Sequence, residues 1–375
     1  MKAVLTLRSG SEQRHTLALL GSLCLFLSAV EYIIPKPLPF MRLGLANLPL
    51  LLALDILGPL NFFLLALLKV LGQGLISGSL FSYIFLFSLA GTFSSAALMY
   101  LLRYAFGKKR IGFAGIGCAG AMISNGVQLL LAKYLIFGAG LQYLAPPLLA
   151  SGFVTGIALG IFCEFFCRQS QWYAKHTAEG ESGVPSAPLS SSVFHNAEVS
   201  ALKKNIWEER RTRRHQRWNE MFSARALFIT GIIMAVLFTF NPSMIICVIL
   251  FAFFCFLAWF SGKKNNIFIT LIVMAGIVFV NLLAPYGKVL AELGPLHITQ
   301  GSLLAGLKKA LVLEGLLMLS GACVKSELRL PGRIGSLLAE SFRLLELMRE
   351  HRPVIRRGQI IAGIDSLLLK MDSGS

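Results

Sequence analysis

The chain has 375 residues, of which 55% are hydrophobic and 14% are charged, whereas soluble domains carry about a quarter charged residues. Such a composition excludes a soluble globular protein, because a soluble fold could not cover that much apolar surface. The formal net charge of +17 could indicate nucleic-acid binding, but Lys and Arg cluster in short segments between apolar runs. Membrane topology explains this distribution better, so no nucleic-acid partner is expected.

The first part of the chain, residues 14–168, is predicted to be a six-helix membrane domain. Its apolar runs are apolar on every face, which favours transmembrane helices over the alternating strands of a β-barrel. The expected spans lie near residues 16–34, 45–57, 59–72, 80–102, 111–137 and 146–167. The second and third are short and are separated by Gly58 and Pro59, which is typical of a tight or re-entrant pair.

The composition changes over residues 169–225, where a Pro/Ser-rich stretch precedes the basic segment WEERRTRRHQRW. These features predict a cytoplasmic linker. A four-helix membrane domain is expected over residues 226–323, with spans near 226–240, 243–260, 266–284 and 302–323. The predicted fold is therefore an all-α polytopic membrane protein, with about ten transmembrane helices in bundles of six and four.

The remaining residues, 324–375, are predicted to form a cytoplasmic amphipathic tail. In the segment IGSLLAESFRLLELM, residues such as Ile334, Leu338 and Leu345 share one face of a helix. Such a face is expected to lie along the membrane or against a partner. An ordinary packed cytoplasmic helix is the alternative.

The basic residues predict the orientation of the chain in the membrane. The N-terminal tail, residues 103–110, the linker, residues 261–266 and the C-terminal tail are all basic, whereas residues 72–79 and 138–147 contain no Lys or Arg. Since cytoplasmic loops carry the excess of Lys and Arg, both termini are expected in the cytoplasm, with the chain in the inner or plasma membrane.

Charged residues within the spans predict a ligand site, because each costs about 2.5–3.5 kcal/mol at the centre of a membrane helix. Glu31, Lys69 and Lys133 are expected near the outer ends of their helices, and Arg42 in the outer loop before the second span. Three cations and one carboxylate at similar depth predict a pocket for an anionic small molecule, open to the outside. The alternative is that Lys69 and Lys133 reach the outer lipid headgroups.

Polar residues in the same spans extend the expected pocket: Asn47, Gln73, Ser77, Asn125 and Gln128. Buried amides and hydroxyls must find hydrogen-bond partners, which a ligand could supply. Hydrogen bonds between helices are the competing explanation.

Glycines at four-residue spacing mark the sixth span. Gly152, Gly156 and Gly160 form one smooth helix face on which another helix can approach closely. Packing inside the bundle and contact with another subunit are the two interpretations of this face.

The sequence contains no recognisable catalytic apparatus. There is no GxxxxGK[ST] phosphate-binding loop, and Asp occurs only at positions 55, 365 and 372, which excludes an aspartate-rich site for a magnesium-bound diphosphate. No enzyme activity, cofactor or metal site is expected. Cys163 and Cys167 share a helix face, which leaves a metal or redox role open, but the cysteines are more typical of small core residues.

Four segments of the apolar helices are punctuated by glycines and polar residues: RLGLAN (42–47), KVLGQGLISGSLFSYIFLFSLAGTFSSAALM (69–99), GAMISNGVQLLLA (120–132) and PPLLASGFVTGIALG (146–160). Together they resemble a known family, the one filed as heptaprenyl diphosphate synthase component I and also called the Gx transporter family. The resemblance spans residues 14–168. It implies a likeness to the substrate-binding S components of energy-coupling factor (ECF) transporters, whose six helices hold a small molecule beneath an outer loop.

By the same resemblance, the candidate residues occupy defined parts of that fold. Arg42 and Asn47 would belong to the loop and second helix, Lys69 and Ser77 to the region of the third helix, and Asn125 with Gln128 to the fifth helix. Residues 306–342 are similar in layout to the membrane T component of the same transporters.

These resemblances imply a membrane transport subunit that binds an anionic, vitamin-, flavin- or prenyl-diphosphate-like molecule and works with cytoplasmic ATPase subunits. The alternative is a non-catalytic scaffold or accessory subunit of isoprenoid, quinone or redox metabolism.

Overall fold

A computed structural model describes residues 10–33, 44–177, 218, 223–262, 267–293, 296–324, 332–350 and 360–373 of the chain. Of these described residues, 87% are helical. The helices of the N-terminal bundle are α1 (Gly10–Ile33), η1 (Leu45–Asn47), α2 (Leu48–Ala53), α3 (Pro59–Ser77), α4 (Tyr83–Arg110), α5 (Phe113–Ala132), η2 (Lys133–Phe137), η3 (Gly138–Tyr143), α6 (Ala145–Gln169) and α7 (Gln171–His176).

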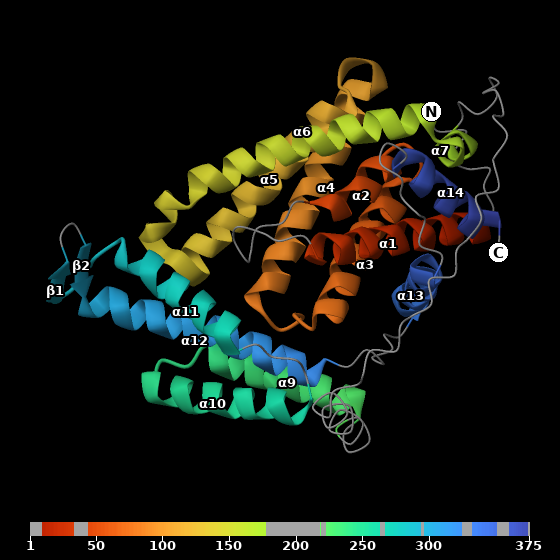
Figure 1. Cartoon of the computed structure of the whole chain (residues 1–375). Helices are drawn as coiled ribbons and strands as arrows, with labels where there is room; N and C mark the ends of the chain where they lie inside the picture. Colours follow the sequence, from red (N-terminus) through yellow and green to blue (C-terminus); the bar gives the residue numbers. More distant parts are fainter. Residues whose placement is uncertain are drawn as a thin grey trace, which may run out of the picture.

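The elements of the second half of the chain are α9 (Ala224–Thr239), α10 (Met244–Phe260), α11 (Ile267–Leu282), β1 (Val289–Leu293), β2 (Leu296–Thr299), α12 (Gln300–Cys323), α13 (Gly332–Glu350) and α14 (Ile360–Ser373). Of these, α9 to α12 lie along one side of the N-terminal bundle, and α13 and α14 lie at one of its ends, near α1 and α7 (Figure 1). The antiparallel hairpin of β1 and β2, which the sequence did not predict, lies at the opposite end of the molecule from α7, α13 and α14.

The lengths and composition of the helices confirm the expected all-α membrane fold. In the described part of the chain, five helices are long and apolar enough to cross a membrane. They are α1, α3, α4, α5 with its continuation, and α6; the shorter α9, α10 and α11 are also apolar. Large apolar side chains such as Ile233, Ile249 and Phe268 are exposed on these shorter helices. Lipid is the solvent that suits such a surface.

The second expected span, residues 45–57, does not form a membrane-length helix. It contains η1 and the six-residue α2, all of whose residues are buried. At 1.5 Å per residue, α2 rises only about 9 Å, far less than the roughly 30 Å of a hydrocarbon core. Pro49, in the first turn of α2, and Gly58 before α3 limit its length on both sides. The short helix is tolerated because it is enclosed by the longer ones.

A buried ion pair holds one end of the bundle together. Arg103 of α4 donates to both carboxylate oxygens of Asp55, at 2.8 and 2.6 Å, and the Tyr173 hydroxyl donates to the same carboxylate at 2.8 Å. Close by, the Asn61 amide at the start of α3 donates to Gln13 at the start of α1. The starts of α1 and α3 and the ends of α4 and α6 therefore meet at one end, called the basic end below.

The C-terminal helices pack on this basic end. The apolar face of α13, which includes Leu338, Leu345 and Met348, is buried, and Ser341 lies directly against Gly21 of α1. The structure thus favours the packed-helix alternative for the amphipathic tail.

Helix α14 is attached to the basic end by hydrogen bonds. Asp365 of α14 accepts hydrogen bonds from the Ser170 hydroxyl at 2.5 Å and from the backbone N–H groups of Gln171 and Trp172. This carboxylate accepts hydrogen bonds from the first backbone N–H groups of α7, which have no acceptor within the helix.

The glycine face of α6 is used inside the molecule. A side chain at Gly160 would approach the carbonyl oxygen of Phe113 on α5 to 2.4 Å, and one at Gly156 would approach Ala121 to 2.7 Å. Packing between α5 and α6 therefore accounts for the spacing, as the first of the two interpretations expected.

A methyl group at Gly160 should therefore separate α5 from α6, because its nearest neighbours are backbone atoms that cannot rotate away. We expect Gly160→Ala to lower the thermal melting temperature of the protein in lipid nanodiscs, by an amount that corresponds to about 1–3 kcal/mol of overpacking. The matched control is Gly126→Ala on α5, where nothing lies within 4 Å of the added methyl. Equal melting temperatures of the two variants would contradict this packing.

Candidate functional site

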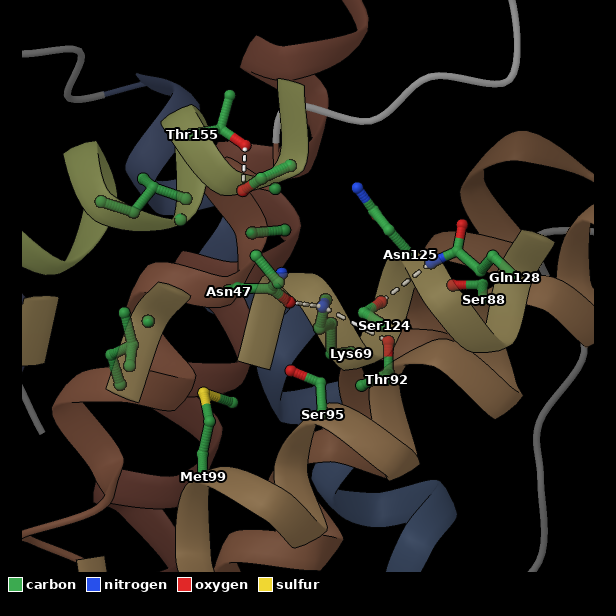
Figure 2. Close-up of a pocket in the computed structure, with 18 of the residues that line it drawn as sticks. Asn47, Lys69, Ser88, Thr92, Ser95, Met99, Ser124, Asn125, Gln128 and Thr155 are labelled. Carbon is green, nitrogen blue, oxygen red and sulfur yellow. Dashed lines mark hydrogen bonds between the residues drawn. The ribbon is translucent and has the colours of Figure 1, made fainter. Parts of the chain in front are cut away.

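A polar cavity lies inside the N-terminal bundle, between α1, η1, α3, α4, α5 and α6 (Figure 2). The cavity has a volume of about 60 Å³, enough for a few waters at roughly 10–15 Å³ each. Its polar lining consists of Glu31, Asn47, Lys69, Gln73, Ser88, Thr92, Ser95, Ser124, Asn125, Gln128 and Thr155. This concentration of polar groups stands out in a bundle whose helices are otherwise apolar.

Lys69 occupies the middle of the cavity, and only 4% of its surface is exposed. Its ammonium group donates to the Asn47 side-chain oxygen and, at 3.5 Å, to the Thr92 hydroxyl, as Figure 2 shows. The side chain is held within the bundle and does not extend to the lipid headgroups. The headgroup interpretation therefore does not describe Lys69.

The chain places Asn47 beside Lys69 through a local turn. Gly44 has a φ of 81°, in the left-handed region that favours glycine, and its carbonyl accepts from the Asn47 N–H at 2.7 Å. A side chain at Gly44 would also approach the Asn47 amide nitrogen to 3.2 Å. The glycine thus both permits the turn and leaves room for the amide.

Two amides of α5 are accommodated by glycines of the neighbouring helices. Asn125 lies over Gly152 of α6, where a Cβ atom would approach its amide nitrogen to 2.0 Å, and it donates to the Leu148 carbonyl at 3.1 Å. Gln128 lies over Gly91 of α4 and donates to the Ser124 hydroxyl at 2.9 Å. The bond from Asn125 to Leu148 is a hydrogen bond between helices, the competing explanation for the amides, whereas the bond from Gln128 to Ser124 stays within α5.

Hydroxyl groups from α4 complete the lining, and the sequence analysis missed them. Ser88, Thr92 and Ser95 all line the cavity. They are spaced by four and three residues, so that they fall on one face of a helix. A search for hydroxyls at helical spacing, in addition to charges and amides, would have found this face.

The structure brings most of the predicted site residues together and leaves others apart. Glu31, Asn47, Lys69, Gln73, Asn125 and Gln128 line one cavity. Ser77 is exposed and donates to the carbonyl of Gln73 one turn earlier, and Lys133 is exposed at the start of η2. Neither contributes to the cavity, and Arg42 lies outside the described residues.

Other polar residues in the membrane helices have structural partners. Glu164 of α6 accepts from the backbone N–H of Ala114 at 3.2 Å, at the start of α5. The seven cysteines are free thiols, and within the described residues no group of three His, Cys, Asp or Glu side chains could hold a metal ion.

The arrangement is suited to binding. A buried ammonium can form charge-assisted hydrogen bonds with carboxylate or phosphate oxygens, and the surrounding amides and hydroxyls can both donate and accept. A small polar molecule is the kind of ligand that this lining complements.

Comparison with known families gives two matches. Residues 224–326 match a domain of unknown function (DUF8519), and residues 20–166 match the family described as heptaprenyl diphosphate synthase component I. No curated protein and no solved structure matched the chain. The match over residues 20–166 begins within α1 and ends at Phe166 of α6, and it contains every residue that lines the cavity. Residues 20–166 are therefore similar to the heptaprenyl diphosphate synthase component I family.

Proposed function

We propose that the chain is a membrane transport subunit, which binds a small molecule with an anionic group in the cavity around Lys69. The observation that carries this proposal is the burial of one ammonium group among amides and hydroxyls at the centre of an apolar bundle. Taking a charge out of water is costly, and a membrane protein retains such a group where it has a partner or a task. In the proposed function, the ligand anion joins the protein groups that this ammonium already contacts.

The strength of the interaction follows from the surroundings of Lys69. Attraction between unit charges rises as the effective dielectric constant falls from about 80 in water toward about 20 near protein. An incoming carboxylate or phosphate would replace or join Asn47 and Thr92 as the acceptor for the ammonium. Exchanging neutral acceptors for a charged one strengthens the hydrogen bonds, so that the ligand gains affinity from charge pairing.

The proposed entry side is the outer face of a cell membrane. The basic end carries Arg103 and Lys108 next to Asp55, and Lys and Arg are enriched on cytoplasmic sides. Glu31, in the last turn of α1, is far from the basic end, where α1 begins. The cavity is thus proposed to open away from the cytoplasm, with both termini on the cytoplasmic side.

The second half of the chain is proposed to link the binding bundle to ATPase partners, as in ECF-type uptake. The two halves touch at defined points: Phe81 N–H donates to Ser320 of α12 at 3.1 Å, and Asn281 of α11 donates to the Ile136 carbonyl at 3.0 Å. In addition, α13 and α14 pack against α1 and α7 at the basic end. A partner that moves the tail would therefore act directly on the bundle that holds the cavity.

Replacing Lys69 tests the binding site. Met has a similar length and no charge, so we expect Lys69→Met to abolish retention of the native ligand, measured as the ratio of ligand to protein by native mass spectrometry. The matched control is Lys133→Met, because Lys133 is exposed and outside the cavity. The proposal fails if Lys69→Met retains as much ligand as the control, or if the wild-type chain retains no anion-containing molecule.

A second candidate function follows from the family description. Residues 20–166 match component I of heptaprenyl diphosphate synthase, which favours a non-catalytic accessory subunit that anchors a prenyl-diphosphate enzyme at the membrane. A diphosphate would also suit the ammonium of Lys69. The two functions therefore share an anionic ligand and differ in the partner.

The partners distinguish the two functions. We expect proteins with phosphate-binding loops to co-purify with the tagged chain from native membranes, and Asp365→Ala to reduce their recovery because it detaches α14 from α7. Ser366→Ala is the control, since its hydroxyl bonds only to Gly363 of the same helix. Recovery of an aspartate-rich prenyltransferase in place of the ATPases would support the accessory function and contradict transport.

A further inference from the structure

Glu31 gives the cavity a second kind of charged group. Its carboxylate, like the ammonium of Lys69, belongs to a side chain that is 4% exposed and lines the cavity. A carboxylate offers roughly four acceptor positions, so it can accept hydrogen bonds from a ligand in addition to the contacts that it already makes in the protein. The lining therefore presents both a strong donor and a strong acceptor.

We propose that the ligand of this cavity is a small organic zwitterion, with its anionic group at Lys69 and a cationic or strongly donating group at Glu31. The inference rests on the proposed function, because it takes the cavity as a ligand site and names the class of molecule. A monoanion would satisfy Lys69 and place a second negative charge in the space that the Glu31 carboxylate faces. Like charges within one cavity repel one another more strongly than they do in bulk water, because the surrounding protein screens them less.

The contacts between α1 and α3 fix the relative depths of the two charges. Gln13 meets Asn61 near the starts of these helices, and Gln73 of α3 donates to Ser28 of α1 at 2.7 Å. Both helices therefore run in the same direction, with Ser28 and Gln73 at one level. Glu31 is three residues beyond this level and Lys69 is four residues before it.

At 1.5 Å per residue, the backbone positions of Glu31 and Lys69 thus differ by about 10 Å along the bundle. Their side chains shorten this gap, but the two charged groups still approach the cavity from different depths. The side-chain amide of Gln73 lies at a depth between these two charged groups and lines the same cavity. The ligand is therefore a molecule whose opposite charges are several bonds apart, with groups between them that can contact amides.

Three probes with the same six-carbon chain test this inference: 6-aminohexanoate, hexanoate and hexylamine. The readout is stabilisation of the full chain in nanodiscs against thermal melting over a range of probe concentrations. We expect 6-aminohexanoate to bind wild-type protein with an apparent affinity about tenfold higher than hexanoate, a difference equal to about 1.4 kcal/mol. Hexylamine, which lacks the anion for Lys69, should not stabilise.

The variant Glu31→Gln removes the negative charge at position 31 and leaves the positive charge of Lys69 in place. It should remove the preference, so that hexanoate binds as well as 6-aminohexanoate, whereas Glu31→Asp, which keeps the carboxylate, should preserve the preference. Unliganded melting temperatures of the variants show whether each is folded. If Glu31→Gln does not fold, the wild-type comparison of the three probes together with Glu31→Asp decides the question.

The outcomes distinguish this inference from the proposed function. Equal stabilisation of wild-type protein by hexanoate and 6-aminohexanoate, lost in Lys69→Met, would overturn the zwitterion and leave anion binding intact. Absence of stabilisation by any probe would also overturn the inference for this class of molecule. The proposed function itself fails when Lys69→Met has no effect on the natively retained ligand, or when the wild-type chain retains no anion-containing molecule.

Discussion

The structure depends on one constraint, which is that polar groups inside a lipid-embedded bundle must find partners within the protein or in a ligand. Exposing apolar surface to lipid costs little free energy, whereas placing a charge or an amide there is costly. Asp55 satisfies the constraint through Arg103 and Tyr173, and Glu164 does so through the start of α5. Lys69 donates to Asn47 and Thr92, beside a space that can hold more polar atoms.

The same constraint explains how the two ends of the bundle differ. At the basic end, ion pairs and helix caps join α4, α7 and α14, so this end is fixed by many short contacts. Toward the other end, glycines allow close helix packing and make room for amides, as Gly152 does for Asn125. A basic end fixed by many contacts and a polar cavity toward the other end suit the proposed binding subunit, whose site would have to open to its ligand while the contacts at the basic end stay in place.

Most of the helices could be predicted from the sequence because length and hydropathy determine which segments can cross a bilayer. The exception is residues 45–57, where hydropathy alone could not show that burial against longer helices replaces exposure to lipid. The β1–β2 hairpin was missed because short strands outside the apolar runs carry no comparable signal. The packing of α13 on α1 required tertiary information, since an amphipathic face alone does not identify its partner.

The amide residues and Lys69 of the candidate site could be predicted from the sequence, because an amide or ammonium group is rare enough in a membrane helix to stand out. Lys133 was included because its depth was similar and Ser77 because it is a polar residue in an apolar span, but neither depth nor polarity determines the direction in which a side chain points. The hydroxyls of α4 escaped notice because Ser and Thr are common in membrane helices and are tolerated there through bonds to their own backbone. Direction around the helix axis was the missing information in both cases.

An experimental density map of the full chain in lipid nanodiscs, purified without washing out bound molecules, tests the central claim most directly. The account predicts density for a ligand or ordered waters within hydrogen-bonding distance of the Lys69 ammonium, enclosed by Asn47 and the amides of α5. A dry, collapsed space in which Lys69 turns outward to the lipid headgroups would contradict it.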